Sequence, residues 1–277
     1  MNENDVPTQY LDRPGGRIAF DVRGSGPLVV LASGMGELRR TYRFLAPALA
    51  NAGFTVATTD LRGHGDSDAT FDAYGDEPTA DDLTALVEHL GGPAVLVGNS
   101  MSAGSAVIVA ARRPDLVSGL ALLGPFVREQ PGGAASRLFF RALMARPWAV
   151  PVWKAYLPSL YAGQKPSDFA EHRRFVVEAL RKPGHAAALV ATTRTSHALS
   201  ESLLGDVAAP TLVVMGDKDP DFPDPRAEAE WIAEALRGEV VMVADAGHYP
   251  QAQQSEVTLD AVASFARKVS DDAARGS

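Results

Sequence analysis

Hydrophobic residues along this chain form two alternating patterns. Short runs rich in aliphatic residues are typical of strands buried on both faces of a sheet, and longer stretches with apolar residues every three or four positions are typical of amphipathic helices. We predict a further, antiparallel strand near the N-terminus at Arg17–Val22. The predicted buried strands are Leu28–Ala32, Thr55–Thr59, Ala94–Gly98, Leu120–Leu123, Thr211–Met215 and Val240–Val243.

Helical periodicity fills most of the segments between these strands. Thr79 is a suitable N-cap for one helix, and Pro114 ends another. Alternation of strands and helices predicts a mostly parallel sheet with helices on both faces. The predicted helices are Leu38–Asn51, Ala80–Leu90, Met101–Arg113, Arg226–Leu236 and Ser255–Lys268.

The alternation stops between Pro125 and Ala209, where prolines and aromatic residues cluster. Helical patterns recur there at Ala134–Met144, Asp168–Leu180 and His185–Thr195. We interpret residues 125–209 as a helical insertion into a core made of residues 1–124 and 210–277. The small, polar residues 270–277 are predicted to fray.

Composition narrows the possible partners. The chain has 277 residues, no cysteine and a formal net charge of −8. An acidic protein is a poor match for a duplex nucleic acid or an anionic membrane. Residues 1–5 lack the features of a signal peptide, and no apolar stretch approaches the roughly 20 residues of a membrane-spanning helix. We therefore expect a cytoplasmic protein with a small-molecule substrate.

The segment from Gly98 to Ser102 carries the strongest chemical signal. A predicted buried strand ends there, small residues follow, and a helical pattern begins at Met101. A serine on such a tight strand-to-helix turn projects its hydroxyl above the edge of the sheet. Ser100 is therefore a candidate nucleophile.

Two more candidates follow later strands. Asp219 comes after Thr211–Met215, and His248 comes after Val240–Val243. Carboxyl ends of parallel strands share one edge of a sheet, so these side chains can meet Ser100 in space. Asp217, Asp221 and Asp224 crowd the same loop as Asp219, but Phe222 replaces the glycine that a calcium loop needs. We expect neither a metal nor a cofactor.

These motifs resemble the α/β-hydrolase superfamily from about Arg17 to Val269. The resemblance implies an eight-stranded, mostly parallel twisted sheet with helices on both faces and a helical cap formed by the insertion. It also implies roles for the three residues, with Ser100 as nucleophile, His248 as base and Asp219 as the carboxylate that orients the imidazole. The backbone N–H groups of Met101 and Met35 are the implied oxyanion-hole donors.

The chain departs from the family pattern at two positions. Ser33 precedes Gly34 where the family often has histidine, and Ser102 closes the nucleophile motif where glycine is usual. Neither change removes a catalytic group. Gly34, Trp148 and Trp153 are candidate substrate contacts.

The expected activity is metal-independent hydrolysis of an ester-like bond through an acyl-enzyme. The bond could belong to a carboxylic ester, a lactone or a thioester of a small, fairly hydrophobic substrate. The same three residues could instead serve a cofactor-free perhydrolase, a haloperoxidase or a lyase, because the fold alone does not fix the reaction. A ligand-binding protein with little turnover is the alternative outside enzyme chemistry.

Overall fold

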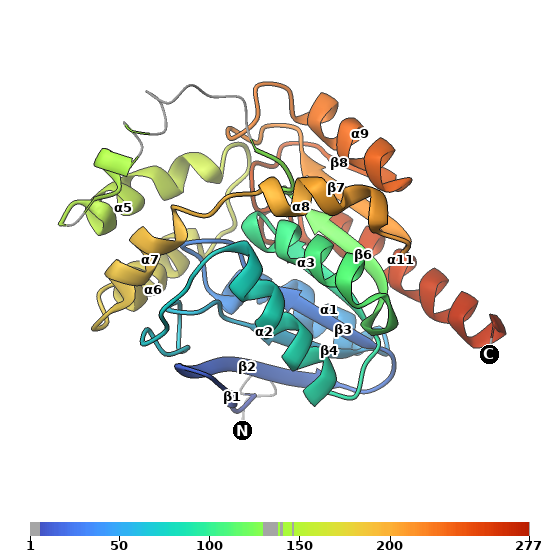
Figure 1. Ribbon diagram of the computed structural model, residues 1–277. Coiled ribbons are helices and arrows are strands. Elements are labelled where there is room, and N and C mark those ends of the chain that lie inside the picture. The colour runs from blue at the N-terminus through green and yellow to red at the C-terminus, as the bar shows by residue number, and fades with distance from the viewer. Residues whose placement is uncertain (1–5, 130–137, 139–140, 146, 277) are drawn as a thin grey trace.

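The computed structural model describes residues 6–129, 138, 141–145 and 147–276. An eight-stranded sheet forms the centre, in the order β1-β2-β4-β3-β5-β6-β7-β8 (Figure 1). The pairs β1–β2 and β2–β4 are antiparallel, and every other neighbouring pair is parallel. The strands are β1 Gln9–Arg13, β2 Gly16–Gly24, β3 Leu28–Ala32, β4 Thr55–Thr59, β5 Ala94–Asn99, β6 Val117–Leu123, β7 Thr211–Gly216 and β8 Glu239–Val243.

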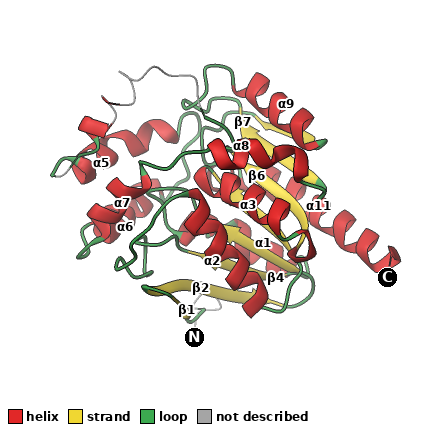
Figure 2. Ribbon diagram, in the orientation of Figure 1, coloured by secondary structure: helices red, strands yellow, loops and turns green. Residues whose placement is uncertain are grey.

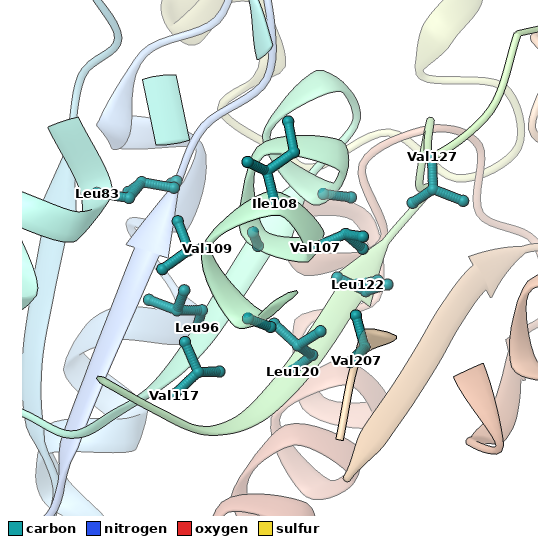
Figure 3. Close-up of a cluster of buried hydrophobic side chains, with 14 of the residues drawn as sticks. Leu83, Leu96, Val107, Ile108, Val109, Val117, Leu120, Leu122, Val127 and Val207 are labelled. Carbon is teal, nitrogen blue, oxygen red and sulfur yellow. The ribbon is translucent and has the colours of Figure 1, made fainter. Parts of the chain in front are cut away.

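Helices cover both faces of this sheet, as predicted (Figure 2). One face packs against α2 (Asp76–His89), α3 (Met101–Arg112) and α9 (Pro225–Leu236), where the side chains in Figure 3 meet. The other face packs against α1 (Leu45–Asn51) and α11 (Ser255–Gly276). Burial of aliphatic side chains on both faces at about 25 cal/mol per Å² of apolar area is what holds the sheet rigid.

The strand predictions are confirmed with small shifts in their ends. Bounds of β3 and β4 agree residue for residue with the prediction, and β6 begins three residues earlier than predicted, at Val117. Strand β1 was not predicted. Its residues are exposed or half-buried, so it lacks the apolar signal of the inner strands.

Two helices differ from their predicted bounds because of proline. The predicted helix at 38–51 is divided into a 3₁₀ turn, η1 (Arg39–Tyr42), and α1, which places Pro47 in the first turn of α1. Helix α2 begins at Asp76 instead of Ala80, and Pro78 again falls in the first turn. Proline has no N–H to donate, which a helix tolerates only where that N–H has no intrahelical acceptor.

The segment between β6 and β7 contains α5 (Ala149–Leu160), α6 (Phe169–Leu180), α7 (His185–Thr192), α8 (Ala198–Leu203) and a short turn, η3 (Leu204–Asp206). In Figure 1, α5, α6 and α7 lie together beside the sheet. They bury a third apolar cluster in which Tyr249 and Ala252, from beyond β8, also take part. Helix α8 packs instead on α3, with Leu204 and Val207 in the main core. The proposed division at residues 125 and 209 stays a prediction.

Helix α5 was not among the helices predicted for this segment, and it contains two prolines, Pro151 and Pro158. Pro151 lies in its first turn, where proline is tolerated. The predicted helix at 134–144 falls mostly outside the described residues.

The prediction of a frayed tail is wrong, since α11 continues to Gly276. Neither glycine nor proline interrupts residues 255–275, so nothing in the sequence ends the helix earlier. None of the helices that the structure describes combines the length and the hydropathy required to cross a bilayer.

Candidate active site

Ser100 occupies a strained turn between β5 and α3. Its φ and ψ angles are 59° and −126°, a conformation that L-residues rarely adopt, and its N–H donates to Leu123 O at 3.0 Å. Gly98 leaves room for this turn, because a Cβ there would lie 2.5 Å from Ser102 O. The hydroxyl-bearing residue is buried but retains 9% exposure, as a group that must meet a ligand requires.

His248 and Asp219 form a buried pair at the same edge of the sheet. Asp219 follows β7, His248 follows β8, and His248 Nδ1 lies 2.8 Å from Asp219 Oδ2. A carboxylate accepts hydrogen bonds, so Nδ1 carries the proton and the lone pair of the neutral ring is on Nε2. Gly124, beyond β6, lies directly against the pair, since a Cβ there would be 3.1 Å from His248 Nδ1.

Two residues connect the Ser100 turn to the His248 loop. Asn99 Nδ2 donates to Leu123 O at 2.9 Å and to His248 O at 3.2 Å. Phe126 N donates to Ser100 O at 3.2 Å, and the Phe126 ring lies edge-on to the His248 ring with centroids 5.8 Å apart. Within the described residues, the Ser100 hydroxyl makes no hydrogen bond. The contact from this hydroxyl to Nε2 therefore stays a proposal; such bonds often tighten only with substrate bound.

The electrostatics of His248 favour its protonated form. Burial lowers the pKa of His248, but the carboxylates of Asp219 and Asp221 outweigh this effect and raise the pKa to about 9. The Glu37 carboxylate, farther away, acts in the same direction. An imidazole in this environment readily accepts and holds a proton.

The loop after β3 faces the Ser100 turn. A Cβ on Gly34 would lie 2.8 Å from Ser100 Cβ, so this glycine lies beside the serine, and its contact with substrate stays a prediction. Among the described residues, neither the Met35 N–H nor the Met101 N–H has a hydrogen-bond acceptor. The role of these two N–H groups as oxyanion-hole donors stays a prediction.

The two departures from the family pattern contact each other. Ser102 Oγ donates to Ser33 O at 2.5 Å, and both residues are fully buried. This bond joins the first turn of α3 to the start of the loop that carries Met35. The acceptor is the backbone carbonyl of residue 33, so the Ser102 hydroxyl fixes the loop to the helix without using the Ser33 side chain.

The same loop is fixed from the other side by α5 and α6. Trp153 Nε1 donates to Gly36 O at 2.9 Å. Glu37, fully buried, accepts from His172 Nε2 at 2.8 Å and from Tyr161 OH at 3.3 Å. The indole N–H of Trp153 is therefore used within the protein, to hold the loop, and a contact of Trp153 with substrate stays a prediction.

Trp148 does not share this position. Its side chain is 61% exposed at the N-terminus of α5, and the structure gives it no contact with Ser100 or His248. The proposed substrate contact at Trp148 gains no support from the geometry.

Several residues of this region were not predicted as site residues. Asp221 Oδ2 lies 3.6 Å from His248 Nδ1, and the Tyr156 hydroxyl donates to Asp221 Oδ1. The crowding of aspartates in one loop was a visible signal for Asp221. Glu37, His172 and Tyr156 gave none, because their partners are 65 to 135 residues away in the chain.

Asp219, Asp221 and His248 are also a group whose possible ligand atoms lie within 4.8 Å of one another. The 2.8 Å contact between Nδ1 and Asp219 Oδ2 is an ordinary hydrogen-bond distance, so proton sharing accounts for the arrangement. We assign no metal to it.

A hollow of about 740 Å³ lies elsewhere, between β2, η1 and α6. Arg39, Arg43, Asp60, Asp168 and Lys182 are among the residues that line it, and most of these charges are paired with each other. It contains none of the predicted site residues.

Comparisons with known proteins agree with the architecture. The family model described as "alpha/beta hydrolase fold" matches residues 27–254. The chain is 31% identical over 272 residues to 2-(acetamidomethylene)succinate hydrolase of Mesorhizobium japonicum, covering 90% of this chain and 92% of the relative.

Solved structures show the same similarity. A thermophilic esterase from Thermogutta terrifontis superposes with a TM-score of 0.79 at 27% identity, covering 95% of this chain and 99% of the esterase. A bromoperoxidase from Bacillus anthracis also gives a TM-score of 0.79, at 20% identity, covering 94% and 99% of the two chains, which shows a shared fold alone. The predicted resemblance and fold class are confirmed, and the chain belongs to the alpha/beta hydrolase family of enzymes.

Proposed function

We propose that this chain is a metal-independent serine hydrolase that cleaves an ester-like bond through an acyl-enzyme. The single observation that carries the proposal is the buried His248–Asp219 pair beside the strained turn of Ser100. A neutral hydroxyl is a weak nucleophile near pH 7, and an adjacent base whose tautomer is fixed by a carboxylate is the usual means of activating it.

In the proposed reaction, Ser100 Oγ attacks the carbonyl carbon of the substrate while His248 Nε2 takes the hydroxyl proton. The negative charge that develops on the carbonyl oxygen is held by the N–H groups of Met35 and Met101. His248 then returns the proton to the leaving alcohol oxygen. Water then attacks the acyl carbon while His248 Nε2 takes its proton; the bond from this carbon to Ser100 Oγ breaks, His248 returns the proton to Oγ, and the acid is released. Each oxyanion donor is expected to contribute about 100-fold or more to kcat.

The substrate class is a carboxylic ester, lactone or thioester of a small, fairly hydrophobic molecule. Met35 and Leu38 pack with the apolar cluster of α5–α7 beside the loop that faces Ser100, which supports an apolar surrounding. The relatives named as an esterase and as a hydrolase of 2-(acetamidomethylene)succinate support hydrolysis at a carbonyl. A test panel therefore includes that acetamido compound beside esters, a lactone and a thioester.

The test is the Ser100→Ala variant. We expect loss of fluorophosphonate labelling and about a 10⁶-fold fall in kcat for p-nitrophenyl acetate. Ser105→Ala is the matched control, because Ser105 is a buried serine of α3, the helix that begins directly after Ser100. Mass spectrometry of the enzyme quenched during turnover should show the acyl group on Ser100. Labelling and turnover that survive Ser100→Ala would sink the proposal.

Two other outcomes separate the alternatives. Peracid formation from acetate and peroxide that exceeds ester hydrolysis would indicate a perhydrolase. Tight binding of a ligand with negligible acylation in a single turnover would indicate a binding protein.

A further inference from the structure

Two carboxylates face the proton-bearing nitrogen of His248. Asp219 Oδ2 is 2.8 Å from Nδ1, and Asp221 Oδ2 is 3.6 Å from the same atom. A single N–H can donate one short hydrogen bond, which goes to Asp219. The second carboxylate is close enough to stabilise an imidazolium by charge alone.

The loop itself fixes the relative position of the two acids. Asp221 N donates to Asp219 Oδ1 at 3.1 Å, and Asp219 N donates to Gly216 O at 3.3 Å. The Asp219 side chain is fully buried, and that of Asp221 is 17% exposed. Asp221 is therefore held in a largely desolvated position, where a charge interacts more strongly than at the surface.

A residue from outside this loop holds the far side of Asp221. The hydroxyl of Tyr156, on α5, donates to Asp221 Oδ1. Tyr156 also packs edge-on against Trp153, with ring centroids 6.0 Å apart, and Trp153 donates to Gly36 O. Helix α5 thus contacts both the acid loop and the loop that carries Met35.

We propose that Asp221 is a second positioning carboxylate for His248, kept beside the ring by Tyr156, so that two anions and not one support the imidazolium that forms during the reaction. This inference rests on the function proposed above. It assigns no direct contact with substrate to Asp221 or Tyr156.

The charges around His248 are consistent with this role. Asp219 and Asp221 come from the loop after β7, and Glu37 comes from the loop after β3. Burial lowers the pKa of His248, while these three carboxylates raise it. Burial also raises the pKa of Asp221, and the neighbouring Asp219 adds to the effect, so the loop holds two like charges whose repulsion a protonated His248 relieves.

The experiment compares Asn variants, which keep the shape of aspartate and remove its charge. In triads with one carboxylate, this replacement lowers kcat about 10⁴-fold. Here we expect Asp219→Asn to lower kcat only about 100-fold, and the double variant Asp219→Asn/Asp221→Asn to lower it about 10⁴-fold. The readout is kcat and kcat/KM for p-nitrophenyl acetate from pH 5.5 to 10.5, with folding checked by circular dichroism.

Asp221→Asn alone gives the second signature. It should lower the pH of the acid limb of kcat/KM by about one unit, because the imidazolium loses one anion. Tyr156→Phe should move the limb in the same direction by less. Asp217→Asn is the matched control, since Asp217 is an exposed aspartate of the same loop and its limb should stay in place.

The failures of the two proposals are distinguishable. A Ser100→Ala variant that retains turnover overturns the proposed function itself. If Ser100→Ala is inactive, an unmoved limb in Asp221→Asn together with a full 10⁴-fold loss in Asp219→Asn overturns the role of Asp221. An unmoved limb in Tyr156→Phe overturns the part assigned to Tyr156.

Discussion

The turn between β5 and α3 and the helices α5–α7 are built in different ways. Backbone hydrogen bonds hold the turn: Ser100 N donates to Leu123 O, and Ala103 N donates to Ser100 O. Gly98 has no room for a side chain. Helices α5–α7 are attached to the core by side chains, through Trp153 on Gly36 O and through His172 and Tyr161 on Glu37.

This difference determines what each region tolerates. Where backbone packs on backbone, an added methyl group has nowhere to go, because neither partner can change its rotamer. Where side chains make the attachment, the sensitive change is a lost atom, which leaves a buried partner without its hydrogen bond. Substitutions that add atoms should therefore disturb the turn at Ser100. Substitutions that remove a hydrogen-bonding atom should weaken the attachment of α5–α7 to the core.

Gly98→Ala should have the largest effect. Its Cβ would lie 2.5 Å from Ser102 O and 2.7 Å from Ala103 Cα, so the turn must shift. We expect about 3 kcal/mol lower stability to urea and a fall in kcat of more than about 100-fold, because small displacements of reacting groups have effects of this size. Gly205→Ala is the control, as nothing lies within 4 Å of a Cβ there. Equal stability and activity of the two variants would contradict a turn built on backbone contact.

The pH dependence of the wild-type enzyme tests the pKa of His248. A base must be neutral to accept a proton, and the pKa of His248 is raised to about 9. We therefore expect kcat/KM for p-nitrophenyl acetate to fall about 10-fold per unit as pH drops below about 9. The measurement subtracts spontaneous hydrolysis. A profile that is level from pH 7 to pH 10 would show that the neighbouring carboxylates do not raise the pKa of His248 above about 7.

The same contrast explains how far the sequence could be read. Strands β3 and β4 were predicted to the residue, because short runs of aliphatic and β-branched residues are local signals. Ser100, Asp219 and His248 were predicted from their places after β5, β7 and β8, whose carboxyl ends the topology of a parallel sheet brings to one edge. Contacts of Glu37 with His172 and of Asp221 with Tyr156 join residues 135 and 65 positions apart, and no local pattern encodes them. Helix α5 was not predicted, and it contains Pro151 in its first turn and Pro158 farther along.

Glu37→Ala should break the side-chain attachment. The change leaves His172 Nε2 and the Tyr161 hydroxyl buried without their acceptor. Groups of this kind lower stability by about 2 kcal/mol when unpaired, measured here by urea unfolding. Glu37→Gln keeps one acceptor oxygen and should recover part of the loss. Glu178→Ala is the control, because Glu178 is an exposed residue of α6 whose only ion pair in the described residues, with Arg174, is long at 3.8 Å. If Glu37→Ala unfolds at the wild-type urea concentration, the buried contacts do not secure α5 and α6.

Ser102 combines both kinds of contact, backbone and side chain, and we expect its removal to have the smallest effect. Ser102 belongs to the backbone-built turn, yet its hydroxyl makes the bond to Ser33 O that holds the loop of Met35. Ser102→Ala removes one hydrogen bond, worth about 1 kcal/mol, and so should lower kcat about 5-fold with little change in KM. Ser105→Ala removes a longer contact, 3.5 Å to Met101 O, from the same helix and should leave kcat unchanged. A lower kcat in Ser102→Ala alone would mean that the bond from this serine side chain helps to hold the loop of Met35. Equal kcat values in both variants would mean that backbone contacts suffice to hold the loop. The loop of Met35 would then be held in the same way as the turn at Ser100.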